Sequence, residues 1–440
     1  MSSESRLEKV LSLIKNKENI FITGIGGTGK TYLIKQIYEQ LKLNSVSNYD
    51  VALTSTTGVS AYNIGGKTVH SWSGLVLPSI IPNNVDPIIQ KAIRKITLKP
   101  LLYKSWKNVK YLIIDEISML GSTYLDFLNI IAQKIRENKN PMGGIQIICS
   151  GDLLQLPPVK DDFCFESISW DQLKLKFVIL NKAYRFQDQD WIDILKRSRT
   201  GDLTNQDVEQ LKKRVSLSSC EEPGVPYLPT IISPVNREVD KINQIELEKI
   251  NGLEKTYYSI DTYFDLPILA NAPEKRCNME QKEMLNKYFN LEEMITIKEG
   301  CQVMLLVNLD VELGLVNGSK GIVELLQHDS AIVKFKSGSH KIEFYRASMD
   351  DDDKIYFRRM LPLRVAYACT IHKIQGCTLD NAIVSCGRGI FEDGQAYVAL
   401  SRVRSLEGLQ LIDFYQAKVK PNRKALNYEK KMLEGAIMLD

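Results

Sequence analysis

Short apolar runs alternate with segments of helical periodicity through the first half of the chain. This alternation is typical of a parallel sheet whose strands are connected by helices. A helical segment over Asn181–Arg199 separates the first set of strands from a second set. The expected elements are strands at Ile20–Thr23, Asp50–Thr54, Tyr111–Asp115 and Ile145–Ser150, a helix over Tyr32–Leu41, and second-set strands at Thr230–Ser233 and Cys301–Leu306.

The pattern changes over residues 321–359, where short alternating strands follow one another without a helix. We expect a small all-β insertion there, with strands at Ile322–Val323, Ala331–Phe335 and Lys341–Tyr345. The run Asp350–Asp353 fits a solvated loop tip, and the strand-like Leu363–Ala368 returns to the larger fold. Over Asn251–Leu291 we expect irregular structure and helix.

Composition narrows the class of protein without identifying it. The chain has 440 residues, of which 44% are hydrophobic and 25% charged, with a net charge of +4. These values indicate a globular protein of about two to three domains, in which any nucleic-acid track must be a local cluster of Lys and Arg. No apolar stretch has the length of a bilayer span, and Met1–Val10 lacks the apolar core of a signal peptide. We therefore expect a soluble, intracellular protein without a membrane partner.

The cysteines are scattered along the chain without the spacing of a metal site. None forms a Cys-x-x-Cys pair, and no His cluster accompanies them. We expect reduced, buried thiols and no structural metal. The eight positions are Cys149, Cys164, Cys220, Cys277, Cys301, Cys369, Cys377 and Cys386.

Gly24–Thr31 reads GIGGTGKT, which matches the G-x-x-x-x-G-K-T pattern of a phosphate-binding loop. It follows a predicted strand and begins a predicted helix, and this context makes the match specific; a glycine-rich turn without a ligand is the alternative. Lys30 would reach the β- and γ-phosphates, and Thr31 would hold Mg²⁺. The expected nucleotide-binding residues are Gly24, Gly26, Gly27, Thr28, Gly29, Lys30 and Thr31.

Leu112–Glu116 reads LIIDE, an apolar strand that ends in two acids. Asp115 suits Mg²⁺ coordination, and Glu116 suits activation of the attacking water. An apolar strand capped by solvated acids is the alternative. The position of this segment after a phosphate loop favours the ATPase interpretation.

Gly151–Val159 reads GDLLQLPPV and follows a predicted strand. A Gln at the end of a strand beside the γ-phosphate is able to sense whether that phosphate is present, and we expect Gln155 to do so. A proline-terminated loop with a surface Gln is the alternative.

Pro141–Val159 (PMGGIQIICSGDLLQLPPV) closely resembles the diagnostic stretch of the petite integration frequency (PIF) helicase family of superfamily 1B. The resemblance covers most of the chain and is weakest over Leu75–Lys107, Ser216–Val225 and Asn251–Leu291. Further segments that resemble family motifs are Ser55–Gly74 (STTGVSAYNIGGKTVHSWSG), Ala183–Phe186 (AYRF), Gly300–Val307 (GCQVMLLV), Leu315–Gly321 (LVNGSKG), Thr370–Thr378 (TIHKIQGCT) and Gly394–Arg402 (GQAYVALSR).

The resemblance implies that Arg185 and Arg402 supply positive charge to the transferring phosphoryl group from across a cleft. Arginine suits this role because its planar guanidinium binds phosphate oxygens in pairs. A surface salt bridge is the alternative for either residue. Gly376 is a further nucleotide-binding position implied by the same resemblance.

The resemblance also implies which residues contact single-stranded DNA, through phosphate contacts and base stacking. For Trp72 a position in the protein core is an equal alternative, and for Lys373 a solvated surface position is the alternative. The implied residues are Thr57, Gly58, His70, Ser71 and Trp72 on the first domain and Asn236, Arg237, His372 and Lys373 on the second.

Two features depart from the family pattern or leave it open. The family places a Gln upstream of the phosphate loop to recognise adenine; the corresponding position falls near Leu7, and the first Gln of this chain is Gln36. Recognition of the base is therefore left open. The segment at about 75–108, where the family carries a small wedge, contains several prolines and a basic patch that do not define its shape.

The expected architecture is α/β, with two RecA-like P-loop domains built on parallel sheets and ATP in the cleft between them. The expected boundaries are 1–182 for the first domain with its short insertion, 183–320 and 360–440 for the second, and 321–359 for a small β-barrel insertion. The resemblance implies a monomeric ATP- and Mg²⁺-dependent helicase that travels 5′-to-3′ on single-stranded DNA and opens tailed or forked duplexes. Three alternatives stay open: a translocase or remodeller without unwinding, a single-strand-binding protein with a degenerate ATP site, and a relative of the RecD-like branch.

Overall fold

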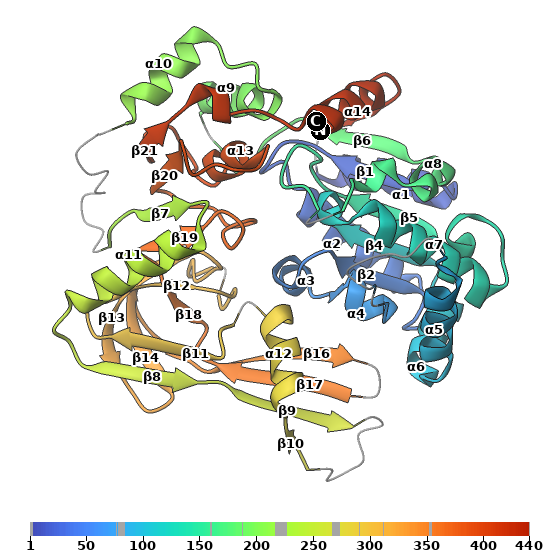
Figure 1. The fold of residues 1–440 in the computed structure, drawn as a ribbon, viewed down its shortest axis with the longest axis horizontal. Helices are drawn as coiled ribbons and strands as arrows, with labels where there is room; N and C mark the ends of the chain where they lie inside the picture. The colour runs from blue at the N-terminus through green and yellow to red at the C-terminus, as the bar shows by residue number, and fades with distance from the viewer. Residues whose placement is uncertain are drawn as a thin grey trace.

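The computed structural model contains two α/β units and a β-rich region (Figure 1). The first unit holds the elements from Ser3 to Leu180 and the C-terminal segment from Arg423 to Leu439, and the second unit and the β-rich region share the rest. The structure describes residues 3–75, 77, 84–158, 161–186, 188–215, 227–265, 273–289, 291–310, 312–351 and 354–439.

The first unit is a seven-stranded sheet in the order β22-β6-β1-β5-β4-β2-β3, and every pairing in it is parallel. The predicted strands Ile20–Thr23 and Tyr111–Asp115 are confirmed as β1 and β4. The remaining strands are β2 (Val51–Ser55), β3 (Lys67–Thr68), β5 (Gln146–Ser150), β6 (Lys176–Leu180) and β22 (Ile437–Leu439). The helices are α1 (Ser3–Lys15), α2 (Lys30–Leu43), α3 (Gly58–Ile64), α4 (Val69–Ser73), α5 (Asp86–Thr97), α6 (Pro100–Asn108), α7 (Ser122–Arg136) and α8 (Ile168–Leu173).

The strands of this sheet are almost continuously buried because helices cover both faces, as is usual for parallel sheets. The carboxyl ends of β1, β4 and β5 therefore lie side by side. They lead into the phosphate loop (Gly24–Thr31), the acids Asp115 and Glu116, and the segment Gly151–Pro158, called the Gln155 segment below. This topology brings three separate sequence motifs to one edge of the sheet.

The second unit is a four-stranded parallel sheet in the order β19-β7-β20-β21. The helix predicted over Asn181–Arg199 is correct only from Gln189 onward, because residues 181–186 are not helical and the backbone N–H groups of Tyr184 and Arg185 donate to the phosphate loop. The strands are β7 (Thr230–Ser233), β19 (Ala368–Thr370), β20 (Ala382–Cys386) and β21 (Leu409–Phe414), and the helices are α9 (Gln189–Thr200), α10 (Asn205–Lys213), α11 (Asn236–Glu248) and α13 (Gln395–Leu400).

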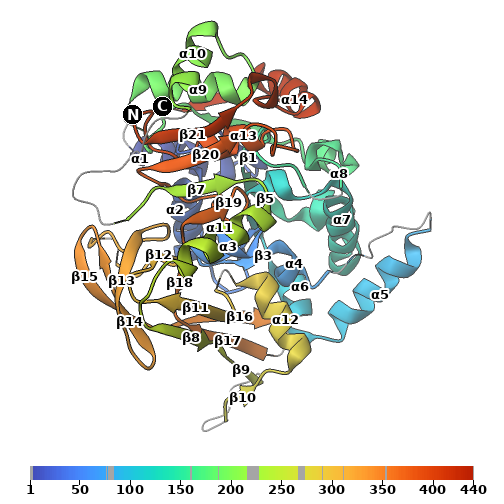
Figure 2. The ribbon, with the colours of Figure 1, turned by 60° about the vertical axis from the view of Figure 1, so that its left-hand side comes forward.

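The C-terminal segment of the chain packs on the first unit, whereas residues 360–440 were expected to belong to the second domain. Strand β22 pairs with β6, and α14 (Arg423–Leu433) inserts Ala425 and Met432 into the core of the first unit. The apolar side chains of this segment complete that core and the edge of its sheet. The two termini consequently lie close together (Figures 1 and 2).

The β-rich region is larger than the expected insertion over residues 321–359. Its core extends from Leu247 to Leu363, so Asn251–Leu291 contributes strands as well as a helix. Its sheets have the orders β15-β14-β13-β12-β18, β10-β9-β17-β16 and β11-β8. The elements are β8 (Glu254–Tyr258), β9 (Ile260–Asp265), β10 (Lys275–Arg276), α12 (Met279–Tyr288), β11 (Met294–Lys298), β12 (Gln302–Leu305), β13 (Lys320–Leu326), β14 (Ser330–Phe335), β15 (Gly338–Glu343), β16 (Tyr345–Asp351), β17 (Lys354–Met360) and β18 (Leu363–Val365).

Two predicted strands lie elsewhere than expected. Cys301–Leu306 was placed with the strands of the second unit, but β12 belongs to an antiparallel sheet of the β-rich region. Leu363–Ala368 divides between β18 in that sheet and β19 in the second unit. An apolar run defines a strand but not its partner, since the partner is set by tertiary packing. Part of the predicted Asp350–Asp353 loop tip lies outside the described residues.

The remaining expectations concern the short insertion, the thiols and the membrane. Residues 86–108 form α5 and α6, which pack against α7, whereas Pro78 and Pro82 lie outside the described residues. The cysteines within the described ranges are unpaired and buried, and Cys220 lies outside them. No helix in the described ranges has both the length and the apolarity to cross a membrane.

Candidate active site

The phosphate loop connects β1 to α2, and its shape depends on glycine at Gly27. The backbone of Gly27 has φ 83°, and an added Cβ would lie 2.5 Å from the Cβ of Arg185. The carbonyl of Gly27 accepts hydrogen bonds from the N–H groups of Tyr184, at 2.8 Å, and Arg185, at 3.3 Å. A side chain at this position would push residues 184–186 off the phosphate loop.

Lys30 is the first residue of α2, and its side chain turns back into the loop. The ammonium donates to the carbonyls of Gly24, at 2.7 Å, and Ile25, at 3.1 Å. Burial lowers the pKa of Lys30 despite the nearby carboxylates, of which Asp152 has the largest effect. A buried cation held only by carbonyl groups suits an anionic ligand.

Asp115 and Thr31 form a pair of oxygen donors next to the phosphate loop. The Thr31 hydroxyl donates to Asp115 Oδ2 at 3.0 Å, and the hydroxyl of Ser150 donates to Asp115 Oδ1. Asp115 is 2% exposed, and its Oδ1 also accepts the N–H of Glu116 at 3.0 Å. Carboxylate and hydroxyl oxygens are the ligands that Mg²⁺ prefers, so these residues fit that ion.

Glu116 has the properties of a general base. Its backbone lies in the left-handed region, at φ 54°, and the Thr56 hydroxyl donates to its carbonyl at 2.8 Å. Its Oε2 is enclosed and has no hydrogen-bond partner within the described residues. Burial and the charge of Asp115 raise the pKa of Glu116 to about 7. A carboxylate with a pKa near neutrality is well suited to proton transfer.

Two arginines of the second unit reach the phosphate loop. Arg402, 2% exposed, follows α13 and donates to the carbonyl of Val398 at 3.0 Å and to the Ser401 hydroxyl at 2.7 Å. Arg185 donates to the carbonyl of Ser401 at 3.3 Å. Burial and the charge of Arg402 lower the pKa of Arg185 to about 9, and burial also lowers the pKa of Arg402. The two guanidinium groups are thus adjacent and bonded to neutral groups.

Gln155 lies at the contact between the two units. The side chain is 6% exposed and donates to Asp152 Oδ2 at 3.2 Å. Its amide oxygen accepts from Gln375 Nε2 at 3.5 Å, so the Gln155 segment touches the segment that carries His372 and Lys373. This contact connects the nucleotide cleft with a proposed strand-contacting segment.

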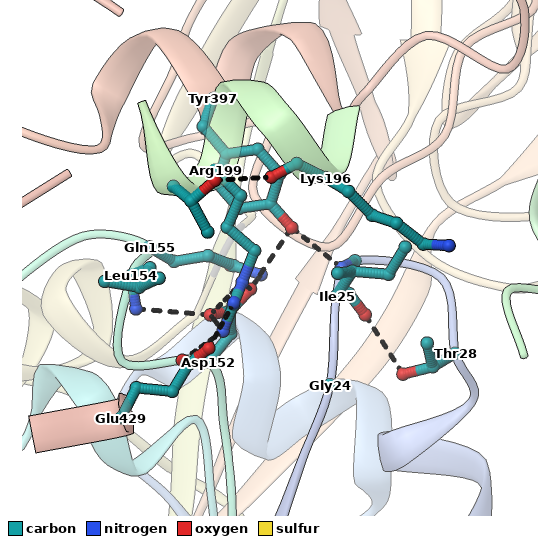
Figure 3. Close-up of polar contacts among 12 residues, drawn as sticks. Gly24, Ile25, Thr28, Asp152, Leu154, Gln155, Lys196, Arg199, Tyr397 and Glu429 are labelled. Atoms are coloured by element: carbon teal, nitrogen blue, oxygen red, sulfur yellow. Dashed lines mark hydrogen bonds and ion pairs between the residues drawn. The ribbon is translucent and has the colours of Figure 1, made fainter. Parts of the chain in front are cut away.

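The structure adds four residues that the sequence interpretation did not include (Figure 3). Tyr397 accepts the N–H of Gly26 at 2.9 Å and donates to Asp152 Oδ2 at 3.2 Å. Arg199 binds both oxygens of Asp152 and both oxygens of Glu429. Asp152 and Tyr397 stand inside family-like motifs, which was an available signal. Arg199 and Glu429 stand in no motif and become visible only when α9 and α14 meet.

In the first unit, the residues expected to contact single-stranded DNA lie in α3, in α4 and in the turns before these helices. The Thr57 hydroxyl accepts the N–H of Ser60 at 3.2 Å, and a Cβ on Gly58 would lie 1.9 Å from the carbonyl oxygen of Tyr288 in the β-rich region. His70 is exposed, its ring 4.2 Å from that of Tyr124, and Ser71 is partly buried.

Trp72 was expected to contact DNA, with a core position as the equal alternative, and the core position is correct. The side chain is 7% exposed, and its ring lies 4.8 Å from that of Trp106. The ring therefore stabilises the first unit and is not open for base stacking. Its burial follows from the apolar environment formed by α4 and α6.

The candidates on the second unit are exposed. Asn236 and Arg237 begin α11, and His372 and Lys373 follow β19. Lys373 has one carboxylate nearby, with 4.0 Å between its Nζ and an oxygen of Glu292. Gly376 has φ 85°, and a Cβ added there would lie more than 4 Å from any other part of the described structure beyond its two chain neighbours.

A cavity of about 980 Å³ lies between the first unit and the β-rich region, away from the phosphate loop. Ser71 and Trp72 line one side, and Tyr288 and residues 345–349 line the other. Ser71, which was expected to contact single-stranded DNA, therefore faces the β-rich region across this cavity.

The position expected for an adenine-reading Gln holds a different chemistry. Leu7 is partly buried, and its neighbour Arg6 lies over the ring of Tyr184, 5.0 Å from the guanidinium carbon to the ring centroid. The Tyr184 ring is 54% exposed and lies beside the phosphate loop. This corner of the cleft thus offers an aromatic face and a cation, without an amide.

Known proteins resemble the chain over most of its length. Residues 4–209 match the PIF1-like helicase family, and residues 280–326 match the family described as DNA helicase Pif1, 2B domain. The chain is 35% identical to the ATP-dependent DNA helicase PIF1 of Danio rerio, over 98% of this chain and 64% of that protein. It is 32% identical to the ATP-dependent DNA helicase Pif1 of Bdellovibrio bacteriovorus, over 96% of this chain and 90% of that protein.

A solved structure shares the fold. The crystal structure of Bacteroides sp Pif1 in complex with ADP-AlF4 superimposes with a TM-score of 0.79 and 26% identity, covering 100% of both chains. The chain spans less than two thirds of the length of the vertebrate relatives that it matches.

Proposed function

Because the chain belongs to the PIF1-like helicase family, we propose that it is an ATP-dependent DNA helicase. It hydrolyses ATP, moves on single-stranded DNA in the 5′-to-3′ direction and separates tailed or forked duplexes. The relatives named above are ATP-dependent DNA helicases, and the Bacteroides sp protein was crystallised with ADP-AlF4. Their activity supports the reaction, and their fold supports the position of the nucleotide.

One observation carries the proposal: three cations from two units converge on one phosphate loop. Lys30, Arg185 and Arg402 form no ion pair within 4.0 Å among the described residues. Burying cations without anions is costly, so the cleft is built for a ligand that carries several negative charges. A nucleoside triphosphate meets this requirement.

The remaining side chains supply the chemistry of hydrolysis. Mg²⁺ held by Thr31 and Asp115 would neutralise charge on the phosphates. Glu116 takes a proton from the attacking water, and Gln155 senses the γ-phosphate. Arg185 and Arg402 stabilise the charge that develops on the transferring group. Because both arginines belong to the second unit, hydrolysis depends on how the two units are placed.

The proposed contacts with single-stranded DNA are also divided between the two units. We place Thr57, Gly58, His70 and Ser71 on the first unit against the strand. A second set, comprising Asn236, Arg237, His372 and Lys373, holds it from the second unit. Opening and closing of the cleft would alternate these two grips and convert each ATP cycle into a step. A single chain contains both grips, which supports a monomer as the active form.

The first test is ATP hydrolysis with and without single-stranded DNA, for the wild type and for Lys30→Ala. We expect DNA to stimulate the wild type and the variant to lose activity. Hydrolysis that is indifferent to single-stranded DNA would contradict the helicase. Strand displacement from 5′- and 3′-tailed duplexes then tests direction. Unwinding only from a 3′ tail would contradict the direction, and hydrolysis without displacement would indicate a translocase.

A further inference from the structure

The hydroxyl of Tyr397 joins three parts of the ATP cleft at one point (Figure 3). It accepts the N–H of Gly26 in the phosphate loop and donates to Asp152 in the Gln155 segment. Tyr397 itself stands on α13 of the second unit, which leads directly to Arg402. Since a phenol has one proton to donate, both functions of the hydroxyl are in use.

Tyr397 and the carboxylate that accepts its hydrogen bond are both buried. Tyr397 is 2% exposed and Asp152 is 0% exposed, so neither replaces its lost hydrogen bonds with water. Gln155 donates to the same oxygen of Asp152 that Tyr397 uses, at 3.2 Å. A change in the position of Tyr397 is therefore transmitted to Gln155 as well as to the phosphate loop.

Arg199 stabilises the ionised form of Asp152. Burial favours its neutral form, but the charge and hydrogen bonds of Arg199 outweigh burial and lower the pKa of Asp152. Arg199 comes from α9 of the second unit and also binds Glu429 on α14, in the C-terminal segment that returns to the first unit. Both ends of this chain of charges are thus anchored in the first unit, with the second unit between them.

We propose that Tyr397 is a positioning residue that couples the placement of Arg402 to the phosphate loop. Its hydroxyl holds the loop and the Gln155 segment in register with the helix that presents the arginine. When the second unit moves away, Tyr397 loses both hydrogen bonds together, and the loop and Gln155 respond as one. This inference rests on the proposed ATP hydrolysis and names a residue that acts on it without contacting the phosphates.

The test is Tyr397→Phe in the full chain, which removes one oxygen and keeps the ring. We expect kcat for ATP to fall roughly tenfold, with KM changed by less than about twofold, because the hydroxyl serves the arrangement of the transition state. The second readout is the affinity for ADP-AlF4 relative to that for ADP. This ratio should fall by a similar factor, because only the transition-state analogue requires Arg402 in place.

The matched control is Tyr367→Phe. That hydroxyl accepts the N–H of Gln302 at 3.0 Å, at the junction of the second unit and the β-rich region and away from the phosphate loop. We expect a comparable fall in melting temperature for both variants but unchanged kcat and affinity ratio for the control. Equal losses of activity in the two variants would overturn the proposal, as would unchanged kcat and ratio in folded Tyr397→Phe.

A second variant tests the same hydrogen-bond network at Glu429, which lies at the opposite end of the network from Tyr397. Glu429→Gln weakens the grip on Arg199 and should lower kcat by a smaller factor at unchanged KM. An unchanged kcat in Glu429→Gln together with a Tyr397→Phe that fails to fold also overturns the proposal. If the wild type hydrolyses no ATP, the proposed function fails, while the affinity ratio still tests the role of Tyr397.

Discussion

The nucleotide cleft and the proposed strand-contacting surface differ in how their side chains are held. In the cleft, charged side chains are buried or partly buried, and hydrogen bonds fix several of them, as with Asp152 and Arg402. On the strand-contacting surface His70, His372 and Lys373 are exposed at helix ends and turns. Phosphoryl transfer requires groups that are already oriented, whereas a strand that slides requires shallow contacts that exchange readily.

The largest effect should come from the cleft. Arg402→Ala removes a fixed positive charge from the transferring phosphoryl group, so hydrolysis should fall by on the order of 10³ or more. Nucleotide binding should stay near normal, because Lys30 and the loop remain. Single-turnover hydrolysis together with equilibrium binding measures both. Normal turnover in Arg402→Ala would show that hydrolysis does not depend on this fixed charge. The cleft and the surface would then not differ in how strongly they depend on fixed groups.

Trp72 should behave as a core residue although its segment resembles a DNA-contacting motif. Trp72→Ala should lower the free energy of unfolding by about 3–5 kcal/mol, as large aromatic truncations in cores do. Urea denaturation followed by circular dichroism measures this loss. His70→Ala, two residues away and exposed, is the control and should change stability by less than about 0.5 kcal/mol. A stability loss at His70 equal to that at Trp72 would show that the boundary between core and surface is wrong.

The pH dependence of hydrolysis should reveal Glu116. Because its pKa is raised to about 7, the catalytic anion is lost as pH falls, and kcat/KM should drop by roughly tenfold per unit below about pH 7. The same shift disfavours ionisation of Glu116 in the folded protein, so its contribution to stability declines as pH rises from about 4.5 to about 7. In Glu116→Gln the activity should be low and this inflection absent. An inflection that persists in the variant would assign it to another group.

The smallest effect should come from the strand-contacting surface. Lys373→Ala should weaken binding of single-stranded DNA by a few-fold, irrespective of sequence, and reduce the slope of log affinity against log salt by about 0.7. ATP hydrolysis at saturating DNA should change little, because Lys373 is exposed and has no part in the proposed hydrolysis. Fluorescence anisotropy over a salt series measures the slope. Lys334→Ala, an exposed lysine on β14, is the control and should leave the slope unchanged.

Local sequence was sufficient for the strands around the phosphate loop and for recognising the loop itself. The strands before the phosphate loop and before Asp115 lie where their apolar pattern placed them, because buried parallel strands need continuous apolar runs. The glycines and Lys30 of the phosphate loop were identifiable because phosphate binding requires those residue types at that spacing. Helix over residues 181–186 was predicted wrongly because this segment takes its shape from hydrogen bonds to the phosphate loop and not from its own periodicity.

What only the tertiary structure decided is which distant groups meet. Arg199 and Glu429 are separated by 230 residues and carry no motif, yet they share a bond because α14 returns to the first unit. The described strands between residues 251 and 320 belong to the β-rich region because strand partners are selected by packing, which no local pattern encodes. The sequence by itself determined the phosphate loop, its acids and the family. The meeting of Tyr397, Asp152 and Arg199 required the fold, because hydrogen bonds depend on distances that only packing sets.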